Sequence, residues 1–222
     1  MSIQGVIFDI GGVLSRDVWE HLLYDPPEDK KPLSVSAKYG IPGQEIKEFG
    51  ERLWYDYDRN DGDPDTLERE YWTRIRDRFP QLAGVQTDEL CKMTEDFIHP
   101  VHKDGMSHLL KWLTEKKIKV GICSNNTKFW FPRQIKKFDP YGFFLTESII
   151  LSCDKCINKS DLRMFEMAVQ SLHLEPAECV FVDDRFGNVE RAMKCGMTGV
   201  FFPTDKQTGA EYLSRLLRQL IS

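Results

Sequence analysis

Carboxylates and small polar side chains stand at the ends of three apolar runs in this sequence. They are Asp9, the pair Ser124 and Asn125, and the pair Asp183 and Asp184. If the runs are parallel strands, these residues meet at one edge of a sheet, where carboxylates repel each other unless a cation lies between them. Hard oxygen ligands with open positions suit Mg²⁺. The pattern therefore indicates a magnesium-dependent reaction centre.

Other residues near these positions could handle a phosphoryl group. Gly11 and Gly12 follow Asp9 and allow the backbone to turn sharply close to a ligand. The hydroxyl and amide groups at Ser124 and Asn125 could hold phosphoryl oxygens. Lys159, just before a predicted helix, could offset charge on a trianionic transition state. A helix cap or a turn explains each residue alone, but their recurrence at successive strand ends favours a site.

The elements that must position these residues are alternating strands and helices. Residues 3–14 contain an apolar run rich in β-branched residues that is broken by Gly11 and Gly12, and this run predicts a strand buried on both faces, as in a parallel sheet covered by helices. Further strands are predicted at 118–123, 143–151, 179–182 and 198–202. Helices are predicted at 106–117, 128–138, 161–172 with Ser160 as N-cap, 185–195 and 209–220. This alternation predicts a doubly wound parallel α/β sheet.

A helical insert is expected to separate the first strand from the others. Residues 15–100 lack a second buried strand, and apolar residues recur at helical spacing in 44–57 and 66–79, with a turn at 60–64 between them. We expect a loop at 24–33 and a hinge near His99 to Lys103. The predicted domains are a core of residues 1–14 and 101–222 and a helical domain of residues 15–100. Its aromatic residues are expected to form its core, and one or two of them could face a substrate; these are Trp54, Tyr55, Tyr57, Tyr71 and Trp72.

The charge, the apolar runs and the cysteines of the sequence limit which partners, location and metal sites are expected. Residues 15–100 hold 20 Asp and Glu against 12 Lys and Arg, a net charge of −8, whereas the remainder carries +3. Nucleic acid is therefore not an expected partner. No apolar run approaches the roughly 20 residues that span a bilayer, so no membrane association is expected. Six scattered cysteines predict free thiols and a cytoplasmic location, and the pair Cys153 and Cys156 lacks the second pair that a structural zinc site needs.

The motifs together resemble the haloacid dehalogenase superfamily, in particular its phosphatase-like branch with a helical cap inserted after the first motif. Asp9-Ile10-Gly11-Gly12-Val13 resembles the first motif, which reads Asp-x-Asp-Gly-(Thr/Val). Ser124 and Lys159 resemble the second and third motifs, and residues 181–189 closely match the fourth. The resemblance covers the whole chain, with residues 15–100 in the place of the cap.

This resemblance implies roles for the strand-end residues. Asp9 would be the nucleophile that takes the phosphoryl group as an aspartyl phosphate. Mg²⁺ would be bound by Asp9, the backbone carbonyl of Gly11 and Asp184. Asp183 would orient the water shell of the metal and Lys159.

The resemblance also implies how the phosphoryl group is held, and it exposes one departure. Ser124, Lys159 and backbone amides around Gly11, Gly12 and Asn125 would bind the group being transferred. Phosphatases of the family usually have a second Asp at the position of Gly11, and that residue protonates the leaving group and then activates water. Its loss removes a contribution of typically 10²–10⁴-fold. We therefore expect slow turnover or a good leaving group.

The expected function is a Mg²⁺-dependent phosphatase acting on a small phosphorylated metabolite. Sugar, nucleotide and isoprenoid or lipid phosphates all remain open, and the protein is expected to be a monomer or a homodimer. One alternative is a 2-haloacid dehalogenase, which needs Asp9 but no metal, and which would leave Asp183 and Asp184 unneutralised close to Asp9. Another is a non-enzymatic binding or regulatory protein on the same fold.

Overall fold

The computed structural model describes residues 2–17, 22–24, 34–98, 103–203 and 209–221. A five-stranded sheet in the order β3-β2-β1-β4-β5 forms the centre, and every neighbouring pair of strands is parallel. The strands are β1 (Gly5–Phe8), β2 (Lys119–Ser124), β3 (Ile149–Leu151), β4 (Cys179–Asp183) and β5 (Thr198–Phe201). The predicted doubly wound α/β fold is confirmed.

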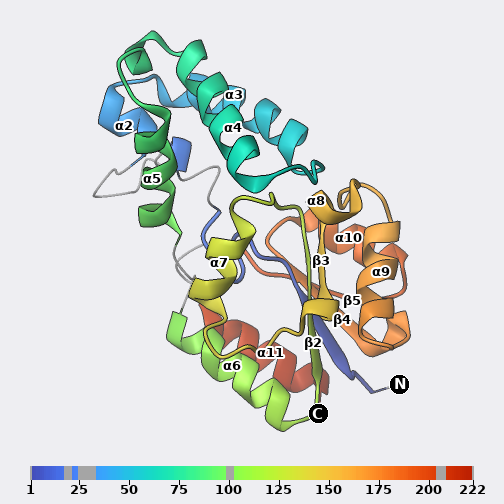
Figure 1. The fold of residues 1–222 in the computed structure, drawn as a ribbon. Helices are drawn as coiled ribbons and strands as arrows, with labels where there is room; N and C mark the ends of the chain where they lie inside the picture. Colours follow the sequence, from blue (N-terminus) through green and yellow to red (C-terminus); the bar gives the residue numbers. More distant parts are fainter. Residues whose placement is uncertain (1, 18–21, 25–33, 99–102, 204–208, 222) are drawn as a thin grey trace.

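Helices cover both faces of the sheet (Figure 1). On one face lie α6 (Lys103–Glu115), α7 (Phe131–Phe138) and α11 (Ala210–Ile221), and on the other lie α9 (Arg163–Ser171) and α10 (Phe186–Lys194). Strand β1 shows the alternation that this requires: Val6 and Phe8 pack into the first apolar cluster, and Ile7 packs into the second. All three are fully buried, as expected for a strand with helices on both sides.

The strand register brings the polar strand ends together. Phe8 pairs with Ile122 of β2 and with Val182 of β4, so the residues that follow lie at the same edge of the sheet. The N–H of Asp9 donates to the carbonyl of Val182 at 2.9 Å, which continues the ladder one step beyond β1. The carboxyl edge of the three central strands is therefore level.

After β1, the described residues include a group of α-helices that form a unit with its own apolar cluster. They are α2 (Val35–Tyr39), α3 (Gly43–Tyr57), α4 (Pro64–Arg78) and α5 (Thr87–Phe97), with the short 3-10 helix η1 (Pro80–Leu82) between the last two. Helices α3 and α4 match the predicted segments 44–57 and 66–79, whereas α2 and α5 were not predicted. The cluster also takes in Phe129 and Trp130, which precede α7. In Figure 1 the unit stands beyond the carboxyl edge of the sheet.

Two local predictions were wrong. The strand predicted at 143–151 is reduced to Ile149–Leu151, because the Asp139 carboxylate accepts hydrogen bonds from the N–H groups of Phe143 (2.8 Å) and Phe144 (3.0 Å) and the 3-10 helix η2 (Thr146–Ser148) follows. Ser160 is not an N-cap: its hydroxyl donates to Asn158 Oδ1 at 2.6 Å, and α9 begins at Arg163.

The remaining predictions concern a loop, a hinge, the cysteines and membrane-spanning segments. The predicted loop at 24–33, apart from Tyr24, and the predicted hinge, apart from Lys103, lie outside them. All six cysteines are free, with Cys153 buried in α8 (Ser152–Lys155) and Cys156 exposed after it. In the described part of the chain, no helix combines the length and apolar character needed to cross a membrane.

Candidate active site

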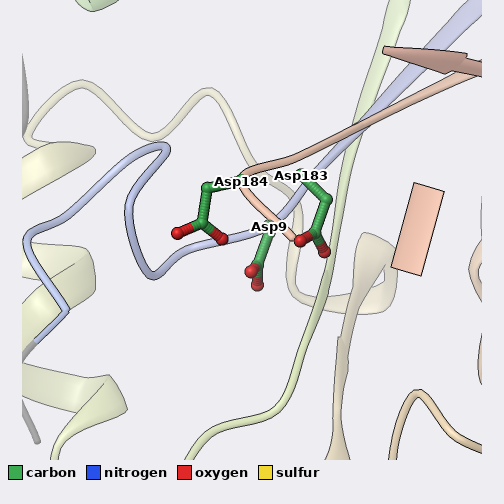
Figure 2. A group of neighbouring side chains, drawn as sticks. All are labelled: Asp9, Asp183 and Asp184. Carbon is green, nitrogen blue, oxygen red and sulfur yellow. The ribbon is translucent and has the colours of Figure 1, made fainter. Parts of the chain in front are cut away.

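Three carboxylates converge at the carboxyl edge of the sheet (Figure 2). Asp9 follows β1, Asp183 ends β4 and Asp184 follows it, and ligand atoms from the three lie within 4.8 Å of one another. Asp183 is fully buried and Asp9 is 6% exposed. The strand-end pattern therefore does bring these three side chains into one cluster, as the sequence predicted.

The electrostatics of this cluster favour a cation. Burial, followed by the negative charges of Asp9 and Asp183, raises the pKa of Asp184 to about 8. Burial also raises the pKa of Asp183, against the opposing effect of Lys159. Among the described residues, this is the group of three or more acidic, histidine or cysteine side chains that could hold a metal. Three carboxylates without a soft ligand are the donor set that suits Mg²⁺.

Lys159 is the buried cation of the site. It lies between α8 and α9, and its Nζ is 2.9 Å from Asp9 Oδ1 and 2.6 Å from Asp183 Oδ2. Burial would lower the pKa of Lys159, but the charges of Asp183 and Asp9 outweigh this effect and raise it. The N–H of Lys159 donates to Asn125 Oδ1 at 2.9 Å. The side chain of Asn125 therefore fixes the segment that carries the lysine.

Asn188 is a site residue to which sequence analysis gave no role. From the first turn of α10, its Nδ2 donates to both oxygens of Asp183 at 3.1 Å, and the N–H of Arg185 donates to Asp183 Oδ1 at 2.8 Å. Together with Lys159, these donors hold Asp183 in one orientation. The position of Asn188 in the fourth motif was a signal that could have indicated this contact.

The remaining predicted residues differ in their access to the site. Gly11 and Asn125 line its pocket, but Gly12 and Ser124 are not among the lining residues. The N–H of Gly12 donates to the carbonyl of Ser15 at 2.9 Å, and its φ of 70° is the left-handed conformation that glycine adopts easily. Ser124 is 1% exposed, and its hydroxyl donates to the carbonyl of Asn125 at 3.4 Å. Gly12 thus shapes the turn after Asp9.

A pocket of about 350 Å³ opens above the carboxylates. The sheet edge forms its floor, and helix α3 of the helical unit contributes Glu51, Trp54 and Tyr55 to its wall. Trp130 and Gln134 line it from the α7 side. The pocket is therefore assembled from both parts of the chain.

Direct contacts hold the helical unit over the sheet edge. Trp54 stacks on Trp130 with ring centroids 5.1 Å apart. Arg133 of α7 pairs with Glu68 of α4 at 2.5 Å, and both side chains are largely buried. The hydroxyl of Ser152 donates to the carbonyl of Asp58. These apolar, ionic and hydrogen-bonded contacts join the helical unit to the sheet side of the molecule.

One further carboxylate faces the pocket and was not predicted. Asp17 lines it, and its carboxyl carbon lies 3.6 Å from the position that a Cβ would take at Gly11. Asp17 Oδ2 is 3.2 Å from an Nη atom of Arg185. No spacing rule links residue 17 to the strand-end motifs, so the sequence pattern could not identify it.

Known proteins of similar sequence and structure include several hydrolases. The flavin mononucleotide hydrolase 1 of Arabidopsis thaliana is 25% identical over 191 residues, which are 86% of this chain and 71% of that protein. The sesquiterpene phosphatase astK of Aspergillus oryzae is 24% identical over 220 residues, 99% of this chain and 97% of that protein. A HAD family enzyme from Bacteroides thetaiotaomicron, solved as a magnesium complex, has a TM-score of 0.68 at 20% identity and covers 98% of this chain and 100% of its own.

The comparison with protein families agrees with the motifs and their geometry. A sequence model of the haloacid dehalogenase-like hydrolases matches residues 3–196, and this range contains every strand-end residue of the site. The resemblance drawn from the motifs at Asp9, Ser124, Lys159 and Asp183 is therefore confirmed. This chain belongs to the haloacid dehalogenase-like hydrolases.

Proposed function

We propose that this protein is a Mg²⁺-dependent phosphatase that hydrolyses the phosphate monoester of a small metabolite through an aspartyl phosphate on Asp9. The observation that carries the proposal is the convergence of Asp9, Asp183 and Asp184 within 4.8 Å beside the buried Lys159. The names of the two relatives, a flavin mononucleotide hydrolase and a sesquiterpene phosphatase, support the same reaction class.

The donor set fits a magnesium ion. Asp9 and Asp184 would hold it with their carboxylates, and Gly11, which lines the pocket beside them, would contribute its backbone carbonyl. Burial and the neighbouring charges of Asp9 and Asp183 raise the pKa of Asp184, and a divalent cation would neutralise this concentration of negative charge. When bound, the ion would screen charge on the phosphoryl group and so let an anionic nucleophile approach it.

The chain itself supplies the nucleophile. A carboxylate oxygen of Asp9 attacks phosphorus, the bond from phosphorus to the ester oxygen breaks, and the alcohol leaves with a proton. Water then attacks the phosphorus of the aspartyl phosphate, the bond to Asp9 breaks, and inorganic phosphate leaves. The ladder bond from the N–H of Asp9 to Val182 holds the nucleophile at the strand end throughout.

Lys159 and Asp183 prepare this nucleophile. Lys159 bridges Asp9 and Asp183, so its ammonium group stays charged and lies where negative charge accumulates on the transferred group. Asp183 takes no part in bond making. Its bonds from Asn188 and from the N–H of Arg185 fix it, and through it they fix the lysine.

Residues 15–100 serve as the cap of this site in the proposal. Helix α3 presents Glu51, Trp54 and Tyr55 to the pocket, and these side chains would contact the part of the substrate that leaves with the ester oxygen. The pocket volume of about 350 Å³ suits a small metabolite. Aromatic walls beside a charged floor favour a leaving group with an apolar face.

Hydrolysis of p-nitrophenyl phosphate tests the proposal. Wild-type protein should hydrolyse it with Mg²⁺ and lose the activity in EDTA, and Asp9→Asn should be inactive while still folded. Asp88→Asn is a matched control, since Asp88 is an exposed partner of Arg69 away from the pocket. Full activity in EDTA, or chloride release from a 2-chloroacid, would contradict the phosphatase and favour the dehalogenase.

A further inference from the structure

The site lacks a carboxylate at position 11, yet a carboxylate from elsewhere in the chain lies beside that position. The geometry points to Asp17 as the general acid and base of the reaction, in place of a side chain at Gly11. This inference rests on the proposed phosphatase function and adds a catalytic residue to it.

The turn after Asp9 brings Asp17 back to the reaction centre. The N–H of Gly12 donates to the carbonyl of Ser15, and residues 11 and 15 form an isolated parallel bridge. The chain therefore folds back over Gly11. Asp17 then stands with its carboxyl carbon and Oδ2 each 3.6 Å from the position of a Cβ at Gly11.

This distance is within the reach of the side chain that Gly11 lacks. The carboxylate oxygens of an aspartate lie roughly 2.4 Å from its own Cβ by ordinary bond lengths and angles. A carboxylate at 3.6 Å from the same point therefore occupies neighbouring space. A Cβ at Gly11 would make only van der Waals contact there, and Gly11 has no left-handed φ, so the backbone would accept a side chain.

The surroundings of Asp17 are those of a group that meets substrate. Asp17 lines the same pocket as Asp9 and Asp184, and its side chain is 16% exposed. Arg185 lies 3.2 Å away and orients the carboxylate from one side. Arg185 itself follows directly on Asp184, so Asp17 is tied to the strand end that carries the carboxylate cluster.

The proposed proton transfers are balanced over the two steps. In the first, the carboxyl proton of Asp17 passes to the ester oxygen as its bond to phosphorus breaks, which leaves the alcohol and an Asp17 carboxylate. In the second, that carboxylate takes a proton from the water that attacks phosphorus, which restores the carboxyl group. The reaction consumes one water and releases one alcohol and one inorganic phosphate.

A purely structural role for Asp17, as an anchor for Arg185, makes a different prediction. An anchor would affect all substrates alike. A general acid matters most when the leaving group is a poor one, so its loss should slow an alkyl phosphate far more than p-nitrophenyl phosphate.

The test is the kinetics of Asp17→Asn with both substrates and Mg²⁺, and Asp88→Asn serves as a matched removal of an Asp from an Asp–Arg pair. We expect Asp17→Asn to lose on the order of 10²–10⁴-fold in kcat on the alkyl phosphate and much less in the first step with p-nitrophenyl phosphate. Because dephosphorylation also needs the base, rapid quench should show a burst of p-nitrophenol approaching the enzyme concentration.

The most discriminating experiment moves the carboxylate from position 17 to position 11. Gly11→Asp combined with Asp17→Asn should recover much of the lost kcat, because a carboxylate is then restored in the space beside Gly11. Gly11→Asp alone should not speed the enzyme, since two carboxylates would then crowd one place. If the double variant does not fold, Asp17→Ala assayed with and without added formate replaces it, and formate should raise its rate whereas chloride should not.

The outcomes separate the two proposals. Equal losses on both substrates with no burst, or an Asp17→Asn variant within twofold of wild type, would overturn the assignment of Asp17 while leaving the phosphatase intact. Absence of recovery by both the double variant and formate would overturn it as well. Failure of the phosphatase itself would show in the wild type, as hydrolysis that persists in EDTA or in Asp9→Asn.

Discussion

A single buried lysine shared by two carboxylates dominates the electrostatics of the site at the scale of the residue. Lys159 is 2% exposed, and it contacts Asp9 and Asp183 at hydrogen-bonding distance. Removing one partner of a buried ion pair leaves an uncompensated charge, which typically costs about 3–5 kcal/mol. The same lysine therefore stabilises the fold and, in our proposal, supports catalysis.

We expect Lys159→Met to lose activity and to lower the free energy of unfolding by about 3–5 kcal/mol at neutral pH. The deficit should shrink as the pH falls, because a buried carboxyl with a raised pKa favours folding when protonated. Denaturant unfolding at pH 5 and pH 8 measures this. Lys128→Met is the control: its pair with Asp154 is about one-third exposed, so it should cost less than about 1 kcal/mol. Equal costs for the two variants would contradict the prediction.

Binding of Mg²⁺ should be coupled to proton release. Burial and the charges of Asp9 and Asp183 raise the pKa of Asp184 to about 8, so below that pH its carboxyl must lose a proton before it can bind the ion. The affinity should therefore weaken by about tenfold for each pH unit below 8. Calorimetry in two buffers of different ionisation enthalpy counts the protons released at pH 7. Asp184→Asn should release fewer protons and bind weakly, and a wild type that releases none would contradict the assignment.

At the scale of the element, sequence patterns succeed where local chemistry and burial agree. The run Val6 to Phe8 has to be a buried strand because helices pack on both of its faces, and the periodicity of α3 and α4 follows from their packing against one apolar cluster. The length of strand β3 was overestimated because the backbone N–H of Phe143 donates to the Asp139 carboxylate instead of joining the sheet. The apolar content of the segment does not reveal this hydrogen bond. The helix α2 is too short to show a helical period.

The residues of the site also divide into those that the sequence predicts and those that it does not. Asp9, Asp183 and Asp184 follow from the rule that parallel strands present ligands at their carboxyl ends. Asp17 is brought to the site by the turn after Asp9, and Asn188 by the first turn of α10. Their contacts therefore depend on tertiary geometry rather than on the spacing of residues in the sequence. Sequence reasoning can thus locate the centre of the site, but the side chains that orient or complete it have to be found in the structure.

The pair between α4 and α7 is expected to hold the helical unit over the pocket. Glu68→Gln should raise KM severalfold and lower the free energy of unfolding by about 1–3 kcal/mol, because Glu68 and Arg133 are largely shielded from water. Steady-state kinetics with thermal unfolding measures both effects. Glu95→Gln is a close control, since Glu95 contacts the same arginine at 3.3 Å but is half exposed. Similar effects from both variants would show that burial of the pair is unimportant.

At the scale of the whole molecule, the chain consists of two apolar assemblies that share one pocket. The sheet packs into clusters on both of its faces, and the helical unit packs into a separate cluster joined by Phe129 and Trp130. The three clustered carboxylates, Asp9, Asp183 and Asp184, come from the sheet side. Glu51, Trp54 and Tyr55 line the pocket from the helical side. A ligand that fills the pocket therefore contacts both assemblies.

This arrangement predicts that a ligand bound at the sheet edge will slow opening of helix α3, although α3 contributes none of the three clustered carboxylates. With Mg²⁺ held at a fixed saturating concentration, inorganic phosphate at 100 times its dissociation constant should add about 2.7 kcal/mol of stability. Hydrogen exchange should then slow in α3 as well as in β1 and β4, because closing the pocket brings Trp54 and Tyr55 against the bound Mg²⁺ and phosphate. Asp9→Asn lacks a ligand carboxylate, so it should show weaker protection at the same ligand concentrations, provided that circular dichroism confirms its fold. Protection confined to the strands, with α3 exchanging at its unliganded rate, would mean that the helical unit does not close over the site and that residues 15–100 do not act as a cap.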